Sequence, residues 1–210
     1  MKTFKGHTAS ISSVTFSLDG GTVVSGSADK SIRLWNILTG ECLKIFNGHD
    51  RGVKSLVLNS ILFCSSSDGI IKICSDDQSI KLSDISTGEC LQSFQGHTNW
   101  VNSVVISSDG DVLASSGNET EIRVWDINSG QNITTLEGHT KRVWSVDISS
   151  DGEKIASSSS DNTVKIWDIQ SGKCLRTFYG HTGAVFKVSI APDNIKLLSG
   201  GDDKTVRIWD

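Results

Sequence analysis

The sequence predicts an all-β protein built from five copies of one short unit, and three observations lead to this prediction. Apolar and polar residues alternate in short runs, as in half-buried strands, and no segment keeps a helical period. Four units have Trp 28 residues after a His, whereas the second unit has Ser83 at the corresponding place. The dipeptide Gly-His recurs at steps of 42, 48, 42 and 42 residues, at Gly6-His7, Gly48-His49, Gly96-His97, Gly138-His139 and Gly180-His181.

The fourth unit shows the order of its elements most clearly. Val143, Val146 and Ile148 indicate a first strand, Ile155 a second, and the alternation at Val164 a third. An Asp-Gly pair follows the first strand, and such pairs tolerate the positive φ of a tight hairpin turn. Each unit is therefore expected to be a meander of antiparallel strands, with turns at Asp19-Gly20, Asp68-Gly69, Asp109-Gly110, Asp151-Gly152 and Asp193-Asn194.

The phased Gly-His pairs, together with Trp35, Trp125, Trp167 and Trp209, resemble the WD40 repeat family. The resemblance covers nearly all of the chain. It implies that each unit is a four-stranded blade of a β-propeller within one domain, residues 1–210. The repeats would span 6–47, 48–95, 96–137, 138–179, and 180–210 together with 1–5.

The resemblance also implies how the ring would close. In the family, Gly-His lies between the outer strand of one blade and the inner strand of the next, so residues 2–5 match an outer strand. We expect this strand to complete the last blade of a five-bladed ring, which would remove exposed sheet edges. The alternative is an open or partial array from a larger, typically seven-bladed propeller.

The second unit differs from the others by a net six residues. Alignment on its turn places seven added residues around Ile61-Leu62-Phe63, before Asp68-Gly69. The addition either lengthens a hairpin or covers neighbouring surface, and use by a partner stays open beside plain structural variation.

Composition argues against several classes of function. The net charge is −4 and no run of Lys or Arg occurs, so neither nucleic acid nor an anionic membrane is implied as a partner. No apolar stretch suggests a secretion signal or a membrane span, which favours the cytoplasm or the nucleus. The cysteines lack metal-site spacing, so no metal or cofactor is expected, and we expect buried reduced thiols at Cys42, Cys64, Cys74, Cys90 and Cys174.

The resemblance implies a structural tetrad of His, Ser, Asp and Trp in each blade, rather than a catalytic triad. Repetition in five units argues against an active site, which needs a unique constellation. The complete sets are expected to be His7, Ser27, Asp29 and Trp35, and His139, Ser159, Asp161 and Trp167. Blades two, three and five are expected to be softer, because they have Ser83 for Trp, Gly117 with Glu119, and Gly201, respectively.

Function is expected where the units differ. In WD40 proteins, the residues flanking the first apolar residue of each inner strand, and the residue before the tetrad acid, open onto the top face. The resemblance places Trp100, Arg142, Trp144 and Phe186 there, with Lys54, Asn102, Asp76 and Asp202, and with Ala28, Asn118 and Ser160 before the tetrad acid. Trp and Arg are enriched at binding hot spots, although Trp144 and Phe186 could instead pack between blades.

The sequence thus predicts a non-enzymatic scaffold that binds a protein or peptide through its top face. The first alternative is the sensor portion of a larger multi-domain signalling protein. A remote alternative is an enzymatic or sugar-binding propeller, for which Asp76-Asp77 and Asp202-Asp203 are the local candidates.

Overall fold

The computed structural model describes residues 2–17, 20–47, 51–59, 70–75, 78–84, 87 and 89–210. The chain forms two compact units, Met1–Gly96 and His97–Asp210, and each is described by itself. The single domain that the sequence predicts therefore stays a prediction. The added segment of the second repeat, around Ile61-Leu62-Phe63, lies outside the described residues.

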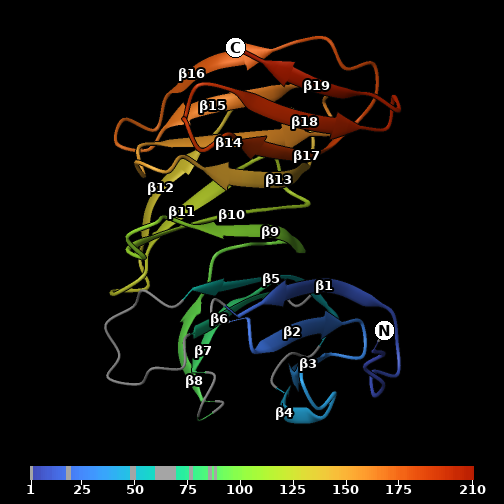
Figure 1. Ribbon diagram of the computed structural model, residues 1–210. Coiled ribbons are helices and arrows are strands. Elements are labelled where there is room, and N and C mark those ends of the chain that lie inside the picture. Colours follow the sequence, from blue (N-terminus) through green and yellow to red (C-terminus); the bar gives the residue numbers. More distant parts are fainter. Residues whose placement is uncertain are drawn as a thin grey trace. The chain divides into compact units, whose positions relative to one another are not determined.

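The first unit contains two four-stranded antiparallel sheets in which neighbouring strands follow one another in the sequence (Figure 1). We call them blade one and blade two. Blade one comprises β1 (Ile11–Phe16), β2 (Thr22–Ser27), β3 (Ser31–Asn36) and β4 (Cys42–Asn47), and blade two comprises β5 (Val53–Asn59), β6 (Ile70–Ser75), β7 (Ile80–Asp84) and β8 (Cys90–Phe94).

The second unit contains two four-stranded sheets and one three-stranded sheet of the same meander type. Blade three comprises β9 (Val101–Ile106), β10 (Val112–Gly117), β11 (Ile122–Asp126) and β12 (Asn132–Leu136). Blade four comprises β13 (Val143–Ile148), β14 (Lys154–Ser159), β15 (Val164–Asp168) and β16 (Cys174–Phe178). Blade five comprises β17 (Val185–Ile190), β18 (Leu197–Gly201) and β19 (Val206–Trp209).

Four of the five predicted hairpin turns are found between the first and second strands, and Asp68-Gly69 lies outside the described residues. Gly20, Gly110 and Gly152 have φ of 67°, 86° and 75°, and Asn194 has φ of 59° in the fifth repeat. This left-handed region suits glycine and is tolerated by Asn, which explains the residues at these turns.

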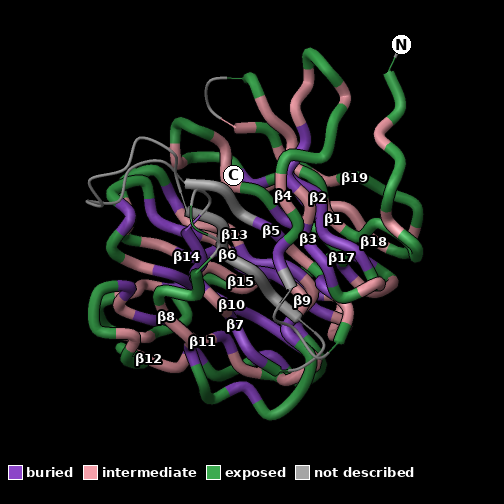
Figure 2. Tube along the Cα trace, turned by 90° about the horizontal axis from the view of Figure 1, so that it is seen from below, coloured by how far each residue is buried: buried purple, intermediate pink, exposed green. Residues whose placement is uncertain are grey.

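The core lies between successive blades, and buried residues follow the strands (purple in Figure 2). In the first unit, Val24, Ile32 and Leu34 of blade one pack with Val53 and Leu56 of blade two. In the second unit, blade three packs on blade four in the same way, and blade four on blade five. Since these sheets bury a face against a neighbouring sheet of the same unit, the alternating pattern determines the strand register.

Closure of the ring by residues 2–5 is not seen among the described residues. Blade five has three strands, and residues 2–10 belong to no strand. The Phe4 ring instead lies 5.7 Å from the Trp35 ring, much as Phe178 at the end of β16 lies 5.4 Å from Trp209. Residues 2–5 thus make the contact that an outer strand makes with the following blade, and the five-bladed ring stays a proposal.

The expectation of buried thiols was wrong for three cysteines. Cys42, Cys90 and Cys174 are exposed free thiols at the first position of β4, β8 and β16. Each stands opposite the Trp position at a register shift, on the outermost strand of its sheet. An edge strand has no further strand to cover it, so a small apolar residue there stays accessible.

Candidate partner-binding site

A chain of buried hydrogen bonds runs through blade four and supports the end of the blade where the candidate site lies. Trp167 Nε1 donates to Ser157 Oγ (2.8 Å), and Ser157 Oγ lies 2.7 Å from His139 Nε2. His139 Nδ1 lies 2.7 Å from Asp161 Oδ2. With the imidazole neutral, Ser157 donates to Nε2 and Nδ1–H donates to the carboxylate, so every buried donor has an acceptor.

The serine of this network is not the one that the sequence analysis named. Ser157, rather than Ser159, bridges His139 and Trp167. Ser159 Oγ instead donates to the Arg142 carbonyl (2.9 Å) and accepts from the Asp161 amide (3.1 Å). Residues two apart in a strand share a face, so Ser157 and Ser159 are equivalent candidates when only the sequence is known. The position of the Trp167 side chain decides which of them is the acceptor.

The same correction applies to blade one, where Ser25 and not Ser27 accepts from Trp35 Nε1 (2.7 Å) and lies 2.8 Å from His7 Nε2. His7 Nδ1 lies 2.8 Å from Asp29 Oδ2. Ser27 Oγ donates to the Ser10 carbonyl (3.0 Å), as Ser159 does to the corresponding carbonyl of blade four.

Blades three and five contain the network too, because their glycines replace the second serine and not the bridging one. The bridging serines are Ser115, 2.7 Å from His97 Nε2, and Ser199, 2.8 Å from His181 Nε2. Gly117 occupies the position of Ser159, and a Cβ there would lie 2.3 Å from the Trp100 carbonyl oxygen. The glycine therefore permits a close approach of two backbones.

Blade two differs from the other four. By strand register, Ile73 stands where blade four has Ser157, and Ser83 stands where it has Trp167. His49 and Asp77, the remaining expected members, lie outside the described residues.

The carboxylates of the network have lowered pKa values. Burial alone would raise the pKa of Glu119, but hydrogen bonds from His97 and Thr98 outweigh it and lower this pKa to about 2. The pKa of Asp161 is likewise well below its usual range, because hydrogen bonds from His139 and Thr163 outweigh the effect of burial. Both groups are thus held ionised as acceptors for backbone and imidazole N–H groups.

The candidate binding residues of the inner strands are the extra residues of β-bulges. The register shifts after the first residue of each inner strand, and the skipped residue turns its side chain out of the regular alternation. These skipped residues are Ser12, Lys54, Asn102, Trp144 and Phe186. The bulge explains why positions that would otherwise alternate inward are free to differ between blades.

In the second unit, three of the expected residues form one cluster, which we call the aromatic patch: Arg142, Trp144 and Phe186. The Trp144 and Phe186 rings meet edge to face at 5.5 Å between centroids. The Arg142 guanidinium lies 5.2 Å from the Trp144 ring, and Trp144 Nε1 donates to Ser160 Oγ (2.8 Å). The patch is therefore held in a defined geometry while Phe186 stays 46% exposed.

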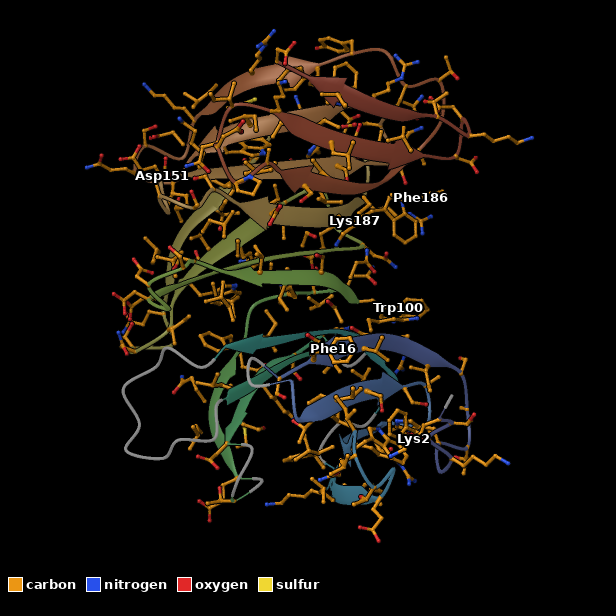
Figure 3. All side chains as sticks on the ribbon, viewed as in Figure 1. Lys2, Phe16, Trp100, Asp151, Phe186 and Lys187 are labelled. Atoms are coloured by element: carbon orange, nitrogen blue, oxygen red, sulfur yellow. The ribbon has the colours of Figure 1, made fainter. Side chains whose placement is uncertain are left out.

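Trp100 and Asn102 belong to blade three of the same unit. Trp100 is 40% exposed, and Figure 3 shows it on the same edge of this unit as Phe186, with Asp151 on the opposite edge. Asn102 Nδ2 donates to Asn118 Oδ1 (3.1 Å) and to the Val143 carbonyl (3.2 Å), so Asn102 links blades three and four.

The remaining expected residues lie elsewhere in the chain. Asp202 is exposed, and its backbone amide donates to the Ala184 carbonyl (2.8 Å). Lys54 is exposed in the first unit, and Asp76 lies outside the described residues. The sequence analysis missed Lys187, which is exposed beside Phe186 (Figure 3) and stands where the other inner strands have Ser13, Ser55, Ser103 and Ser145.

Within the described ranges, no group of three or more His, Cys, Asp or Glu side chains could hold a metal ion. The part of the chain that the structure describes also has no helix long and apolar enough to cross a membrane.

Similarity to known proteins is concentrated in the repeats. COMPASS component SWD3 of Saccharomyces cerevisiae is 38% identical over 77 residues, which is 35% of this chain and 24% of that protein. Mitochondrial division protein 1 of Aspergillus clavatus is 31% identical over 74 residues (35% and 11%), and the Notchless protein homolog of Arabidopsis thaliana is 46% identical over 48 residues (23% and 10%). The chain thus spans about a quarter or less of the length of these relatives.

The family profile described as WD domain, G-beta repeat, matches the chain five times, at residues 1–36, 40–84, 88–126, 130–168 and 172–210. These matches agree with the five repeated sheets and with the His, Ser and Trp hydrogen bonds of blades one, three, four and five. The chain belongs to the WD40 repeat family.

Proposed function

We propose that this chain is a non-enzymatic interaction module that binds a protein or peptide through the aromatic patch, with Trp100 and Asn102 beside it. The single observation that carries this proposal is the pair Trp144 and Phe186. Unlike the His, Ser and Trp of the blade networks, these two aromatic residues stand where blades one to three have Ser12, Lys54 and Asn102, and Phe186 is exposed. Exposed aromatic side chains with an arginine are typical of binding hot spots.

The patch favours a ligand with an apolar side chain next to an acidic group. The edge-to-face rings offer a rigid apolar surface, since two aromatic side chains lose little conformational freedom on binding. Arg142 is an exposed cation beside the Trp144 ring, and Lys187 and Asp202 are exposed residues of the same blade as Phe186. Lys54 and Asp76 of the second repeat are proposed as further contacts because of their positions in the repeat.

Selection from a displayed peptide library would test this function. Selected peptides should bind the wild-type chain and lose at least about tenfold in affinity on Trp144→Ala or Phe186→Ala, because a hot-spot aromatic contributes about 2 kcal/mol or more. Leu175→Ala, an exposed apolar residue of β16, is the matched control and should bind normally. Unchanged affinity in folded Trp144→Ala and Phe186→Ala variants would contradict the patch assignment.

A second candidate is the WD40 sensor portion of a larger multi-domain signalling protein. The observation that favours it is the small share of each relative that this chain spans. One relative is by its name a component of COMPASS, which fits a role inside an assembly. In either case we propose a location in the cytoplasm or the nucleus and one propeller domain over residues 1–210, as a five-bladed ring or as part of a larger array.

An enzymatic or sugar-binding propeller remains the remote alternative. Its local carboxylate pair in the described residues is Asp202-Asp203, and Asp203 is already bonded to His181 (2.7 Å). A screen for hydrolase and glycosidase turnover should therefore give none, and activity lost on Asp202→Asn would overturn the non-enzymatic proposal.

A further inference from the structure

Two asparagine side chains of blade three are bonded to each other next to the strand that carries the aromatic patch. Asn102 is the extra residue of the bulge in β9, and Asn118 follows β10. Asn102 Nδ2 donates to Asn118 Oδ1 (3.1 Å) and to the Val143 carbonyl (3.2 Å). Val143 lies between Arg142 and Trp144 of the patch in the sequence. We call Asn102 and Asn118 the amide pair.

The bonds of the amide pair leave one acceptor and one donor group unused. An asparagine side chain has a carbonyl oxygen that accepts and an NH₂ group that donates. Asn102 Oδ1 and Asn118 Nδ2 have no hydrogen-bond partner among the residues that the structure describes. Neither belongs to the described buried atoms that lack a partner, so both are accessible to solvent. The pair therefore offers an acceptor and a donor to a ligand.

The backbone around the amide pair holds it in place. The Asn118 amide donates to the Trp100 carbonyl (2.8 Å), and Gly117 permits the two backbones to come this close. The next residue, Glu119, accepts from the blade network through Oε2, 3.1 Å from His97 Nδ1. A ligand that binds to groups fixed in this way orders few side chains, so the entropy lost on binding is small.

Blade one shows that the blade does not require an amide pair at these positions. It has Ser12 and Ala28 there. Ser12 Oγ donates to the Val53 carbonyl, which is the link to the next blade that Asn102 makes in blade three. A single hydroxyl is enough for this link. The acceptor and the donor that blade three leaves unused are thus additional to what the packing of blades needs.

Blade four uses the same two positions in another way. They hold Trp144 and Ser160, and Trp144 Nε1 donates to Ser160 Oγ (2.8 Å). The indole has no second polar atom, so blade four presents mainly an apolar surface through Trp144. Neighbouring blades of the second unit therefore offer two different contacts, one to an amide and one to an apolar side chain.

We propose that the amide pair binds one N–H and one C=O of the peptide ligand that face the same way, with Asn102 Oδ1 accepting and Asn118 Nδ2 donating. The inference deepens the proposed function and rests on it, because the aromatic patch supplies the apolar contact. The N–H and C=O of one residue face the same way in an extended strand, as in the hydrogen-bonded pairs of an antiparallel sheet. The side-chain amide of Asn or Gln offers the same chemistry, and the experiment distinguishes the two sources.

A double variant, Asn102→Ser with Asn118→Ala, tests the proposal because it gives blade three the two residues of blade one. Ser at this position keeps a hydroxyl for the Val143 carbonyl, so the variant should fold, which circular dichroism and a thermal melt establish. Peptides selected on the wild type should bind it at least about tenfold more weakly. Asn118→Ala alone leaves the bond from Asn102 to Val143 in place and should also weaken binding.

Another asparagine of blade three supplies the matched control. Asn128 is exposed and its Nδ2 donates to Asp111 Oδ1 (3.4 Å), a contact that involves neither the amide pair nor the patch. Asn128→Ala should bind the selected peptides like the wild type.

Changes in the peptide identify the source of its amide. An ester in place of a main-chain amide removes one N–H donor. If the main chain is bound, the ester at one position should cost at least about fivefold in affinity on the wild type and little on the double variant. If an Asn or Gln side chain is bound, its replacement by Ala should show this difference and no ester should.

The possible results separate this inference from the proposed function. Unchanged affinity in the folded double variant, together with weaker binding by Trp144→Ala, would overturn the role of the amide pair and leave that of the aromatic patch. Equal losses on the wild type and the double variant for every change in the peptide would overturn it as well. Failure to select any peptide, or unchanged affinity in both the double variant and Trp144→Ala, would overturn the inference and the proposed function together.

Discussion

Blades two and four have the same strand pairing but differ in the residues at the serine and tryptophan positions of the hydrogen-bond network. In both, the register shifts after the first residue of the inner strand and again at the Trp position of the third strand. Blade four has Ser157 and a buried Trp167 joined to His139, whereas blade two has Ile73 and Ser83 at the serine and tryptophan positions. The apolar residues of the third and fourth strands are buried alike, Ile80 and Phe94 in blade two and Val164 and Phe178 in blade four.

The comparison teaches that the alternation of apolar residues and the turns are enough to determine the register of a blade. The hydrogen bonds of His, Ser and Trp add stability to a sheet that can pair without them. A buried polar network is most costly when it is partly removed, because its other members lose their partners. Disrupting the network in blade four should therefore cost far more than changing the corresponding residue in blade two.

The largest effect is expected for Trp167→Ser, which gives blade four the residue of blade two. The indole is fully buried, so its loss leaves a cavity and an unpaired Ser157, at a cost of about 3–5 kcal/mol in the free energy of unfolding. Urea unfolding followed by circular dichroism measures this. Trp144→Ser, at a half-buried position, is the matched control, and a loss below about 1 kcal/mol for Trp167→Ser would contradict the comparison.

A smaller effect is expected for Ser157→Ala, which should lower the free energy of unfolding by about 1–3 kcal/mol. The reason is that Trp167 Nε1–H and His139 Nε2 both lose their hydrogen-bond partner. Ser159→Ala is the neighbouring control. It should lower stability through the Arg142 carbonyl and the Asp161 amide, but it should leave the NMR signal of the Trp167 indole N–H in place. A shift of that signal in Ser159→Ala and not in Ser157→Ala would reverse the assignment of the serine.

Lowering the pH should weaken the hydrogen-bond networks, and this effect is expected to be the third largest. Glu119 has a folded-state pKa of about 2 against an ordinary value of 4.5, so its contribution to stability is complete above about pH 4.5. The contribution is lost as the pH falls toward 2, because the unfolded chain binds the proton more readily than the folded one. The urea midpoint of the wild type should fall over this range, and Glu119→Gln should flatten the fall. An equally steep fall in the variant would show that other carboxylates account for it.

The smallest effect is expected for Ser83→Ala in blade two, which should lower the free energy of unfolding by less than about 0.5 kcal/mol. The residue is 7% exposed, but it stands where the other blades have the indole and is too short to replace it. The same urea unfolding experiment applies. A loss as large as that of Ser157→Ala would mean that blade two contains a polar network of its own.

The aromatic patch could be anticipated in part. Repetition separated the residues that every blade shares from those that vary, and three of the variable residues, Arg142, Trp144 and Phe186, do come together. Lys187 was missed because a lysine in a strand gives no signal of its own without the register, which shows that it stands where the other inner strands have serine. The prediction that Cys42, Cys90 and Cys174 are buried was wrong. The alternation of apolar and polar residues does not distinguish an edge strand from a central one.

The sequence by itself determined the all-β class, the five repeats, their turns and their family, because periodic apolar residues and Asp-Gly pairs act locally. Only the tertiary structure decided which serine lies under each tryptophan, since Ser157 is reached by Trp167 of β15 whereas Ser159 bonds the Arg142 carbonyl before β13. It also decided which sheet faces are covered. Burial depends on the neighbouring blade rather than on the residues of the face itself, and so Val164 is buried while Val206, its counterpart, is exposed.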